Sequence, residues 1–467
     1  MGETNVPLFQ PTFNRSVRVE ASAQALTEDA GALLLRQAWE QLGLDGRLGA
    51  LPDARDPDRV TYSMRELVRT RVLLLAQGWG DQGDANLLRY DAAFRLSTSD
   101  RAGESPLADD AHLPSQPTLS RLGHGLAGQN GTTALNGVLL DTSLFRIKAA
   151  EPGRKRMAID IDTMPKEVHG KQDGASYNTH YGVVCFQPLI ALAETGDLLA
   201  VRLRPGGNPS AAEAFGFLAP VLDAAKANGL DICVRMDCGF ANAHIMRELD
   251  ARRVRFITRL RNTPALHQQT EAWFQQTLAA WRAAPSQDQR SATRELWERA
   301  QKGERVRRII AVVVEPQPGE MFGNRFYLCT NLARGEGGSR ALLAYYRQRG
   351  TAEGHIGEYV REALPALRAV PRGSSPGGVT IRDNNVTVVL AALAYQLLHH
   401  LRRGVELVTA QGWSLGRVRE RVLKAAATVV RHGRQTLFRI CATKASLWKA
   451  LAGAICPSAQ LAMGVPS

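Results

Sequence analysis

Cysteine is scarce in this sequence, and long apolar runs are missing. The 467 residues include six cysteines, none of them in a C-x-x-C pair or another spacing typical of metal ligands. We therefore expect free thiols in a reducing compartment, without a structural zinc site or a disulfide framework. No uncharged apolar stretch reaches the length of a membrane-spanning helix, and Met1 to Arg15 lack the apolar core of a secretory signal. The sequence thus predicts a soluble, cytoplasmic protein without a membrane partner.

Acidic residues are the less abundant class of charged residues. Lys and Arg number 58 and Asp and Glu number 45, so the formal net charge is +13. With 44% hydrophobic and 22% charged residues, the composition is that of a folded globular protein, and the length allows about two to four domains. A basic surplus favours a polyanionic partner such as nucleic acid, because phosphates are bound mainly by Lys and Arg. The alternative is that the surface is basic without binding a polyanionic partner.

The middle of the chain predicts an α/β domain. In order, its apolar runs and amphipathic segments predict strands at Met157–Thr163, Phe186–Glu194 and Leu198–Arg204, a helix at Ser210–Asn228, a strand at Asp231–Asp237, a helix at Ala241–Arg253 and a strand at Arg255–Leu260. Thr195-Gly196-Asp197 is a hairpin signal between the second and third strands. This order is that of a ribonuclease-H-like domain, in which the first and fourth strands lie side by side.

The whole chain is expected to divide into four regions. These are a helical DNA-binding or dimerisation region at residues 1–150, an α/β core at 151–262 and 333–373, a β-rich insertion at 263–332, and a helical C-terminal region at 374–467. Within the insertion, a helical stretch rich in Gln and bearing Trp297 is predicted, together with strands at Arg305–Glu315 and Arg325–Thr330. Within the C-terminal region, Leu415–Val430 is predicted to be helical.

A turn followed by a short helix is predicted at Leu113–Leu122. Ser115 can cap this helix, and Pro117 fits its first turn. A helix that opens with Gln, Thr, Ser and Arg suits the reading of DNA, with Arg121 as a contact residue. A structural helix in an accessory bundle is the equally supported alternative.

Three carboxylates stand out by their surroundings. Asp162 closes the first predicted strand, Asp237 closes the fourth, and Glu353 lies near the start of a predicted helix beyond the insertion. Because side chains alternate along a strand, Asp160 points to the same side as Asp162, and either residue can be the metal ligand. Since the first and fourth strands are neighbours, one of these two aspartates is expected to meet Asp237. Capping of the following helix is the alternative role for Asp237.

Converging carboxylates predict a metal site. Mg²⁺ prefers carboxylate oxygens and keeps several waters. Two such ions about 4 Å apart can activate a water or a 3′-hydroxyl and stabilise the leaving oxygen of an in-line displacement. The three carboxylates therefore predict a site for two Mg²⁺ ions, with Mn²⁺ as a substitute, that carries out phosphoryl transfer. Arg349, four residues before Glu353, is placed to bind the phosphate beside the scissile bond.

The sequence resembles the DDE transposases of bacterial insertion sequences, and within them the group marked by Tyr-x2-Arg-x3-Glu. Tyr346, Arg349 and Glu353 match that motif. Other stretches similar to the group's patterns are Ile159–Thr163 with His169-Gly170, Gly206–Asn208, Arg235–Phe240 and Ser115–Arg121. The similarity covers residues 25–440, which is nearly the whole chain.

This resemblance implies a DNA transposase. It implies metal-dependent cleavage at the terminal inverted repeats of a transposon and then strand transfer into target DNA. It also implies a bacterial, nucleoid-associated enzyme that acts as a homodimer in a synaptic complex. In that reading Asp162, Asp237 and Glu353 hold the metal ions, and Arg349 with Tyr346 positions the phosphate.

Some positions depart from the group's pattern or add to it. The group has a Lys about seven residues after the Glu, where this chain has Val360 followed by Arg361, so that Arg361 takes over the phosphate contact or the contact is missing. The resemblance also implies an aromatic residue in the insertion that stacks on a flipped base during hairpin formation, and Trp297, with Trp281 behind it, is the candidate. Arg307 is a candidate contact to the DNA backbone. The competing functions are a transposase-derived DNA-binding protein without catalysis and a metal-dependent nuclease without strand transfer.

Overall fold

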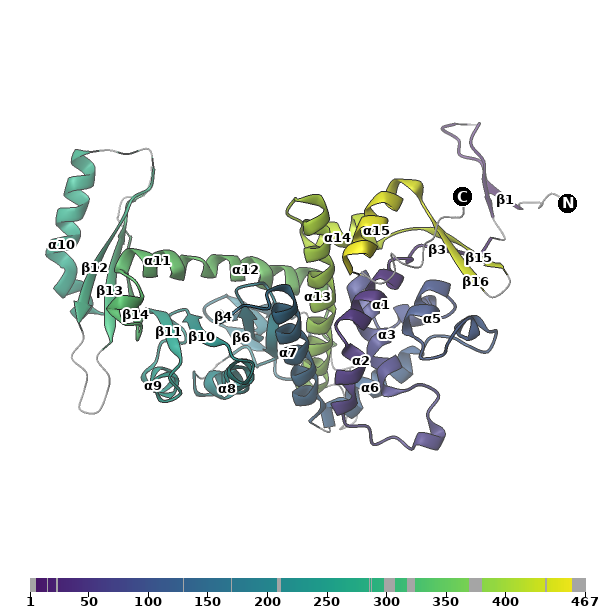
Figure 1. Ribbon diagram of the computed structural model, residues 1–467, viewed down its shortest axis with the longest axis horizontal. Helices are drawn as coiled ribbons and strands as arrows, with labels where there is room; N and C mark the ends of the chain where they lie inside the picture. The colour runs from purple at the N-terminus through teal and green to yellow at the C-terminus, as the bar shows by residue number, and fades with distance from the viewer. Residues whose placement is uncertain are drawn as a thin grey trace. The chain divides into compact units, whose positions relative to one another are not determined.

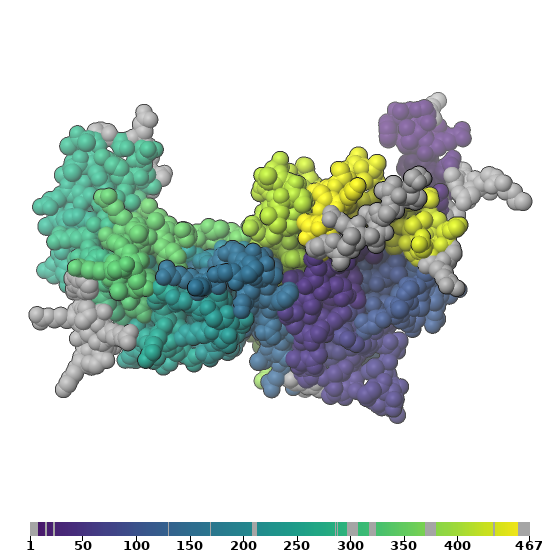
Figure 2. All heavy atoms as spheres, viewed as in Figure 1, coloured from purple at the N-terminus to yellow at the C-terminus, as the bar shows by residue number. Residues whose placement is uncertain are grey.

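The chain forms two compact units (Figures 1 and 2). The terminal unit comprises Met1–Asp45, Ala54–Leu122 and His400–Ser467, and the sheet unit comprises Gly46–Asp53 and Gly123–His399. The structure, a computed structural model, describes residues 6–14, 16–21, 24–128, 130–168, 170–207, 211–284, 286, 288–297, 307–316, 324–368, 380–432 and 435–455. His169, Asn208 and Arg305, singled out above, lie outside this description. The division into four regions along the sequence remains a prediction, and the packing adds that both ends of the chain belong to one unit.

A mixed eight-stranded sheet forms the centre of the sheet unit. Its strands, in spatial order, are β12 (Ser291–Trp297), β13 (Arg308–Val314), β14 (Asn324–Thr330), β11 (Arg255–Leu260), β10 (Asp231–Met236), β4 (Arg156–Thr163), β8 (Leu189–Ala193) and β9 (Leu198–Arg202). β4, β10 and β11 are parallel, and the remaining strands run antiparallel to their neighbours. The predicted pairing of the first and fourth core strands is confirmed, because β4 lies beside β10 with Ile161 opposite Met236.

Helices cover both faces of this sheet (Figure 1). α7 (Gly131–Ala150), α8 (Ala211–Ala227) and α9 (Ala243–Ala251) pack against one face, and α11 (Ser339–Arg347) packs against the other. Along β4, Met157, Ile159 and Ile161 point into the first core. The residues between them, including Asp160, therefore point to the opposite face. Burial on both faces explains why the central strands are nearly continuous apolar runs in the sequence.

The insertion extends the core sheet. Its last strand, β14, pairs with β11, and β13 and β12 follow outward. α10 (Pro264–Ala283) packs on this part of the sheet through Leu266 and Trp273. The prediction that Trp297 lies on a helix is wrong, because Ser291–Trp297 pairs with β13 along its whole length. That ladder is a contact between distant segments, so local sequence does not show it. The side chain of Trp297 lies outside the described part of the structure.

A second, three-stranded sheet accompanies the core. It consists of β5 (Lys166–Glu167), β7 (Val183–Phe186) and β6 (Ser176–Asn178) in that order. β7 leads into β8 through Gln187 and Pro188, so the predicted strand Phe186–Glu194 is divided between two sheets. Pro188 has no amide hydrogen for a strand ladder, which is consistent with a break at this point.

Segments from both ends of the chain make up the terminal unit. Its helices include α1 (Ala32–Gln41), α3 (Met64–Gln77), α5 (Ala92–Thr98) and α15 (Ala442–Ile455). α3 begins at a capping box formed by Ser63 and Glu66. The fully buried Arg69 binds Asp45 and Asp100 and thereby ties three segments of this unit together. α6 (Gln116–Gly128) begins directly after Ser115, in agreement with the predicted turn and helix.

The C-terminal region is only partly helical. α13 (Ile381–Thr409) forms as expected, but the predicted helix at Leu415–Val430 is wrong beyond its first turns. There α14 (Leu415–Val418) and a π-helical turn at Arg419–Leu423 are followed by a hairpin of β15 (Ala427–His432) and β16 (Gln435–Ile440), with β3 (Leu26–Thr27) on its other side. Thr428, Val429 and Val430 are β-branched and favour a strand. Among the described helices, none is long and apolar enough to cross a membrane.

Candidate active site at the ends of β4 and β10

Asp162 and Asp237 lie next to each other at one edge of the sheet. Asp162 is the last residue but one of β4, and Asp237 directly follows β10. Because Met236 is opposite Ile161 in the parallel ladder, Asp237 is in line with Asp162 at a strand spacing of about 5 Å. Both side chains are partly buried. The Asp237 carboxylate accepts a hydrogen bond from the Gly239 amide at 2.9 Å, which fixes it at the turn that leads to α9.

Arg349 connects Asp162 with Glu353. It is the first residue of α12 (Arg349–Glu358), and only 10% of its side chain is exposed. Its Nη2 donates to Oδ2 of Asp162, and its Nη1 donates to Oε1 of Glu353 at 3.1 Å. Arg349 and Glu353 can meet because residues four apart share one face of a helix. The Glu353 side chain is 63% exposed, so this contact with Arg349 is what directs it toward the aspartates.

The charged groups at this edge act strongly on one another. Burial, with smaller contributions from Asp237 and Glu353, raises the pKa of Asp162 to about 6, although Arg349 acts in the opposite direction. Burial also acts to lower the pKa of Arg349, but Asp162 and other nearby groups hold this pKa above its ordinary value. The carboxylates thus form a concentration of negative charge that requires a cation, and Arg349 provides one.

Asp160 takes part in a different contact. It is fully buried and accepts two hydrogen bonds from Arg235, at 2.8 and 2.6 Å. Arg235 is the residue opposite Asp160 in the ladder between β4 and β10, and it also donates to the Tyr345 carbonyl at 3.1 Å. Asp160 therefore neutralises a buried guanidinium on the neighbouring strand. Removing either partner of such a pair leaves an uncompensated buried charge.

Tyr346 holds the end of β10 in place. Its hydroxyl donates to the backbone carbonyl of Met236, the residue before Asp237, at 3.1 Å. Burial raises the pKa of Tyr346 to about 12, so the phenol is a neutral donor. Arg259, near the end of β11, acts against this rise, and its guanidinium lies 5.0 Å from the centre of the Phe326 ring. Nothing in the sequence marks Arg259, because a single Arg at a strand end belongs to no motif.

Tyr181 also reaches this edge and has no counterpart among the predicted site residues. It lies in the turn between β6 and β7, and its hydroxyl is hydrogen-bonded to the side chain of Thr163. Burial, followed by the charges of Asp162 and Asp237, raises the pKa of Tyr181. The two short strands that flank it give no clear signal in the sequence, so the turn could not be placed from the sequence alone.

The other predicted contact residues lie outside this cluster. Arg361 is exposed in the π-helical turn that follows α12, and Arg121 is exposed on α6. Arg307 is 5% exposed and binds Asp250 at 3.3 Å, so its guanidinium does not face solvent as expected of a DNA contact. For Trp297 only the backbone position, at the end of β12, is described.

The donor set at this edge suits a divalent cation. Asp162, Asp237 and Glu353 offer carboxylate oxygens, the ligands that Mg²⁺ prefers. Within the described residues, no three His, Cys, Asp or Glu side chains lie close enough together to hold a metal ion. Arg349 binds both Asp162 and Glu353 and so supplies the positive charge itself. The donor types therefore fit the cation, but the three carboxylates would have to come closer together to hold it, and Arg349 would have to release Asp162 and Glu353.

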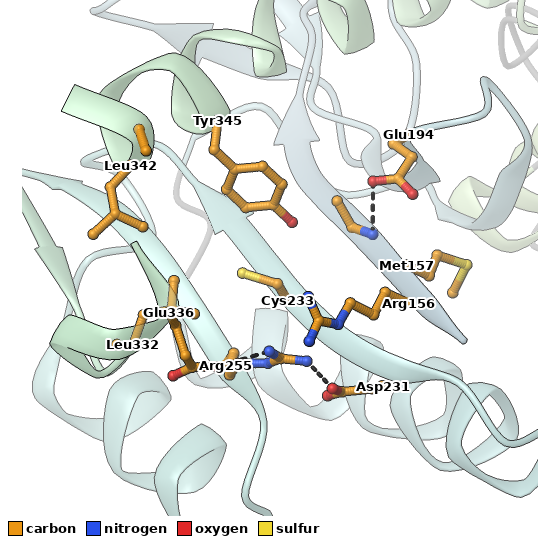
Figure 3. Close-up of a pocket in the computed structure, with 13 residues that line it drawn as sticks. Arg156, Met157, Glu194, Asp231, Cys233, Arg255, Leu332, Glu336, Leu342 and Tyr345 are labelled. Carbon is orange, nitrogen blue, oxygen red and sulfur yellow. Dashed lines mark hydrogen bonds and ion pairs between the residues drawn. The ribbon is translucent and has the colours of Figure 1, made fainter. Parts of the chain in front are cut away.

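A cavity of about 510 Å³ lies at the opposite end of the same strands (Figure 3). Arg156, Asp231 and Arg255, which are the first residues of β4, β10 and β11, line it. Arg255 binds both Asp231 and Glu336 there. Because the three strands are parallel, their full length separates this cavity from the carboxylates, and it is not part of the candidate site.

Comparison with known proteins gives a solved structure and a family model that match this chain. A cryo-electron microscopy structure of a piggyBac transposase synaptic complex with hairpin DNA shares 12% identity with this chain, and the match covers 96% of this chain and 85% of that chain with a TM-score of 0.36. No curated protein matches the sequence. A family model described as "Transposase DDE domain group 1" matches residues 9–454. The protein therefore belongs to the transposase family with a DDE domain of group 1.

Proposed function

We propose that this protein cleaves transposon ends and joins them to target DNA by two-metal phosphoryl transfer in a ribonuclease-H-like core. The observation that carries the proposal is the cluster at one sheet edge, where Asp162 and Asp237 end adjacent parallel strands and Arg349 links Asp162 to Glu353. Membership of a transposase family supports DNA as the substrate. The net charge of +13 favours the same partner.

Asp162, Asp237 and Glu353 are the proposed metal ligands. Asp160 is the less favourable alternative, because its transfer to a metal ion would leave Arg235 buried without its partner. Breaking a buried pair in this way costs about 3–5 kcal/mol. Asp162 differs from Asp160 because its partner Arg349, once released from both carboxylates, can bind a phosphate of the DNA instead.

The proposed mechanism assigns a separate task to each group. When bound, two Mg²⁺ ions, or Mn²⁺ in their place, would activate the attacking water or 3′-hydroxyl and stabilise the leaving oxygen. The paired strands β4 and β10 hold Asp162 and Asp237 at a fixed spacing. Arg349, once released from the carboxylates, can bind the phosphate through two parallel hydrogen bonds. Tyr346 keeps the end of β10 in position through the Met236 carbonyl.

DNA contacts beyond this site are proposed at exposed cations. Arg121 and Arg361 are exposed and suit the binding of backbone phosphates. Arg307 is left out because it is buried, and Trp297 remains the candidate for base stacking on the strength of the sequence resemblance. The proposed partners are the terminal inverted repeats and target DNA, bound by a homodimer in a synaptic complex. The Tyr-x2-Arg-x3-Glu motif supports an element of bacterial origin that acts on DNA in the cytoplasm, at the nucleoid.

The test is cleavage, in the presence of Mg²⁺, of a DNA that carries the inverted repeats flanking the reading frame. Wild-type protein is expected to cut at the repeat ends, and Asp237→Asn is expected to bind the DNA but to cut at least about 100-fold more slowly, because loss of a ligand removes several kcal/mol of transition-state stabilisation. Asp141→Asn is the matched control, since it removes the same charge from an exposed position on α7 and should cut like the wild type.

Each other result selects a different function. Equal cutting by the wild type and Asp237→Asn would show that the site is elsewhere. Binding without cutting by the wild type would favour a regulator derived from a transposase. Cutting without transfer of the cut ends to a second DNA would favour a nuclease.

A further inference from the structure

The turn between β6 and β7 is held by one buried side chain. Asn178, the last residue of β6, is 8% exposed. Its Oδ1 accepts hydrogen bonds from the amides of His180 at 2.9 Å and Tyr181 at 3.2 Å. Its Nδ2 donates to the Gly206 carbonyl at 2.7 Å, and its own carbonyl accepts from the Gly182 amide at 2.8 Å. Four hydrogen bonds to one residue fix the backbone that carries Tyr181.

Two glycines allow this turn to pack closely on the rest of the sheet unit. Gly182 has φ = +71°, in the left-handed region that glycine adopts without strain. A Cβ atom at Gly206 would lie 2.1 Å from the Cys185 carbonyl oxygen and 2.6 Å from that of Ser176. Only glycine leaves room for the backbone contact between Gly206 and the small sheet. The turn is therefore a rigid support and not a free loop.

This support directs the Tyr181 side chain to the carboxylate edge. The phenol is hydrogen-bonded to Thr163, the residue after Asp162. The His180 ring packs edge-on against the Tyr181 ring with their centroids 4.8 Å apart, which restricts the rotation of the phenol. The side chain is only partly buried, and a tyrosine phenol is neutral near pH 7. A neutral hydroxyl donor thus stands beside two carboxylates that have no donor function of their own.

We propose that Tyr181 is a further DNA-contacting residue of this site, and that its hydroxyl donates a hydrogen bond to a non-bridging oxygen of the phosphate held at Asp162 and Asp237. This inference rests on the proposed function. A phosphate brings acceptor oxygens to an edge that is already rich in acceptors, so neutral and cationic donors must surround it. Arg349 approaches this edge from α12, and Tyr181 approaches it from the small sheet.

The test compares Tyr181→Phe, which removes only the hydroxyl, with the wild type. The matched control is Tyr177→Phe, because Tyr177 is 60% exposed on the neighbouring strand β6. The probes are the inverted-repeat DNA in Mg²⁺, for the single-turnover cutting rate, and the same DNA without metal, for the Kd. Loss of one hydrogen bond to a charged group should slow cutting about ten- to a hundredfold in Tyr181→Phe. Tyr177→Phe should remain within about twofold in both measurements.

A sulfur substitution shows whether the contact is direct. If Tyr181 donates to one non-bridging oxygen, a phosphorothioate of one configuration at the scissile position should slow the wild type but add no further penalty in Tyr181→Phe. If the rate penalty of Tyr181→Phe and the rate penalty of the phosphorothioate multiply for both configurations, Tyr181 acts only through Thr163. That result would overturn the inference. Wild-type cutting rates in Tyr181→Phe would also overturn it and leave the proposed function intact, provided that Asp237→Asn is inactive. A wild-type protein that does not cut refutes both proposals.

Discussion

Replacing Asp160 and replacing Asp162 by asparagine should have opposite consequences, although the two residues are only two positions apart. Asp160→Asn is expected to destabilise the fold while sparing the chemistry of the site. Asp162→Asn is expected to spare the fold and abolish cutting. The reason is that Asp160 is committed to Arg235 inside the protein, whereas Asp162 faces the partly open edge beside Asp237.

The cost at Asp160 follows from its burial. Both partners are at most 1% exposed and share two hydrogen bonds, so neutralising Asp160 leaves Arg235 charged and without a counter-charge. Such a change costs about 3–5 kcal/mol. For a unit of this size that free energy lowers the unfolding temperature on the order of 5–10 °C.

At Asp162 the loss of the charge is not expected to destabilise the fold. A rise of the pKa from 3.8 to about 6 means that the ionised form is disfavoured in the folded protein by about 3 kcal/mol at neutral pH, and this figure already includes the attraction by Arg349. Asparagine removes that net penalty. The unfolding temperature of Asp162→Asn should therefore be no lower than that of the wild type.

Thermal unfolding and Mg²⁺-dependent cutting, both measured at pH 7.5, separate these outcomes. Asp160→Asn should unfold at a lower temperature and still cut at temperatures where it remains folded. Asp162→Asn should unfold at or above the wild-type temperature and not cut. The reasoning is refuted if Asp160→Asn is as stable as the wild type but inactive, because Asp160 would then be a ligand and not a structural partner.

Three further changes test individual contacts. Tyr346→Phe removes the hydrogen bond to the Met236 carbonyl. Equilibrium unfolding should show a free energy of unfolding lower by about 1 kcal/mol, and cutting should be slower. Unchanged cutting would contradict the proposed role of Tyr346. Gly206→Ala should lower the unfolding temperature by several degrees, because the added Cβ would collide with the Cys185 carbonyl oxygen. A Gly206→Ala variant as stable as the wild type would show that this backbone contact is not formed. Burial raises the pKa of Asp29 to about 6, so the buried carboxylate is unfavourable above that pH. Asp29→Asn should thus be more stable than the wild type at pH 7.5, by at most about 3 kcal/mol, and this advantage should be gone near pH 4. A stability difference that does not depend on pH would contradict a raised pKa of Asp29 as its cause.

The parts of the fold that the sequence predicts well are those specified by local pattern. β10 and β11 were predicted within one residue, because apolar β-branched runs bounded by polar turns signal buried strands. Pairing is less visible. β14 pairs with β11, and the opposed residues Leu260 and Tyr327 are 67 positions apart in the sequence. The pattern of neither strand shows this pairing, so the sequence identifies the insertion as β-rich but not as part of the core sheet.

The choice between Asp160 and Asp162 shows where sequence reasoning ends. Alternation places both on one side of β4, and nothing in the strand itself distinguishes them. The difference comes from Arg235 on β10, which lies opposite Asp160 in the ladder and takes it as a partner. Register between two strands is a property of their tertiary pairing. A metal ligand and a structural carboxylate can therefore alternate along one strand without any local sign of which is which.

The spacing of Tyr346, Arg349 and Glu353 has a physical basis in the contacts that one helical segment makes. Steps of three and four residues keep all three side chains on one face of a helix. From that face Tyr346 binds the carbonyl before Asp237, Arg349 binds Asp162, and Glu353 is held by Arg349. A motif within eight consecutive residues thus aligns two strand ends that are distant in sequence. Fixing the exposed Glu353 side chain costs about 1.5–2 kcal/mol of conformational freedom, and its contact with Arg349 offsets part of that cost.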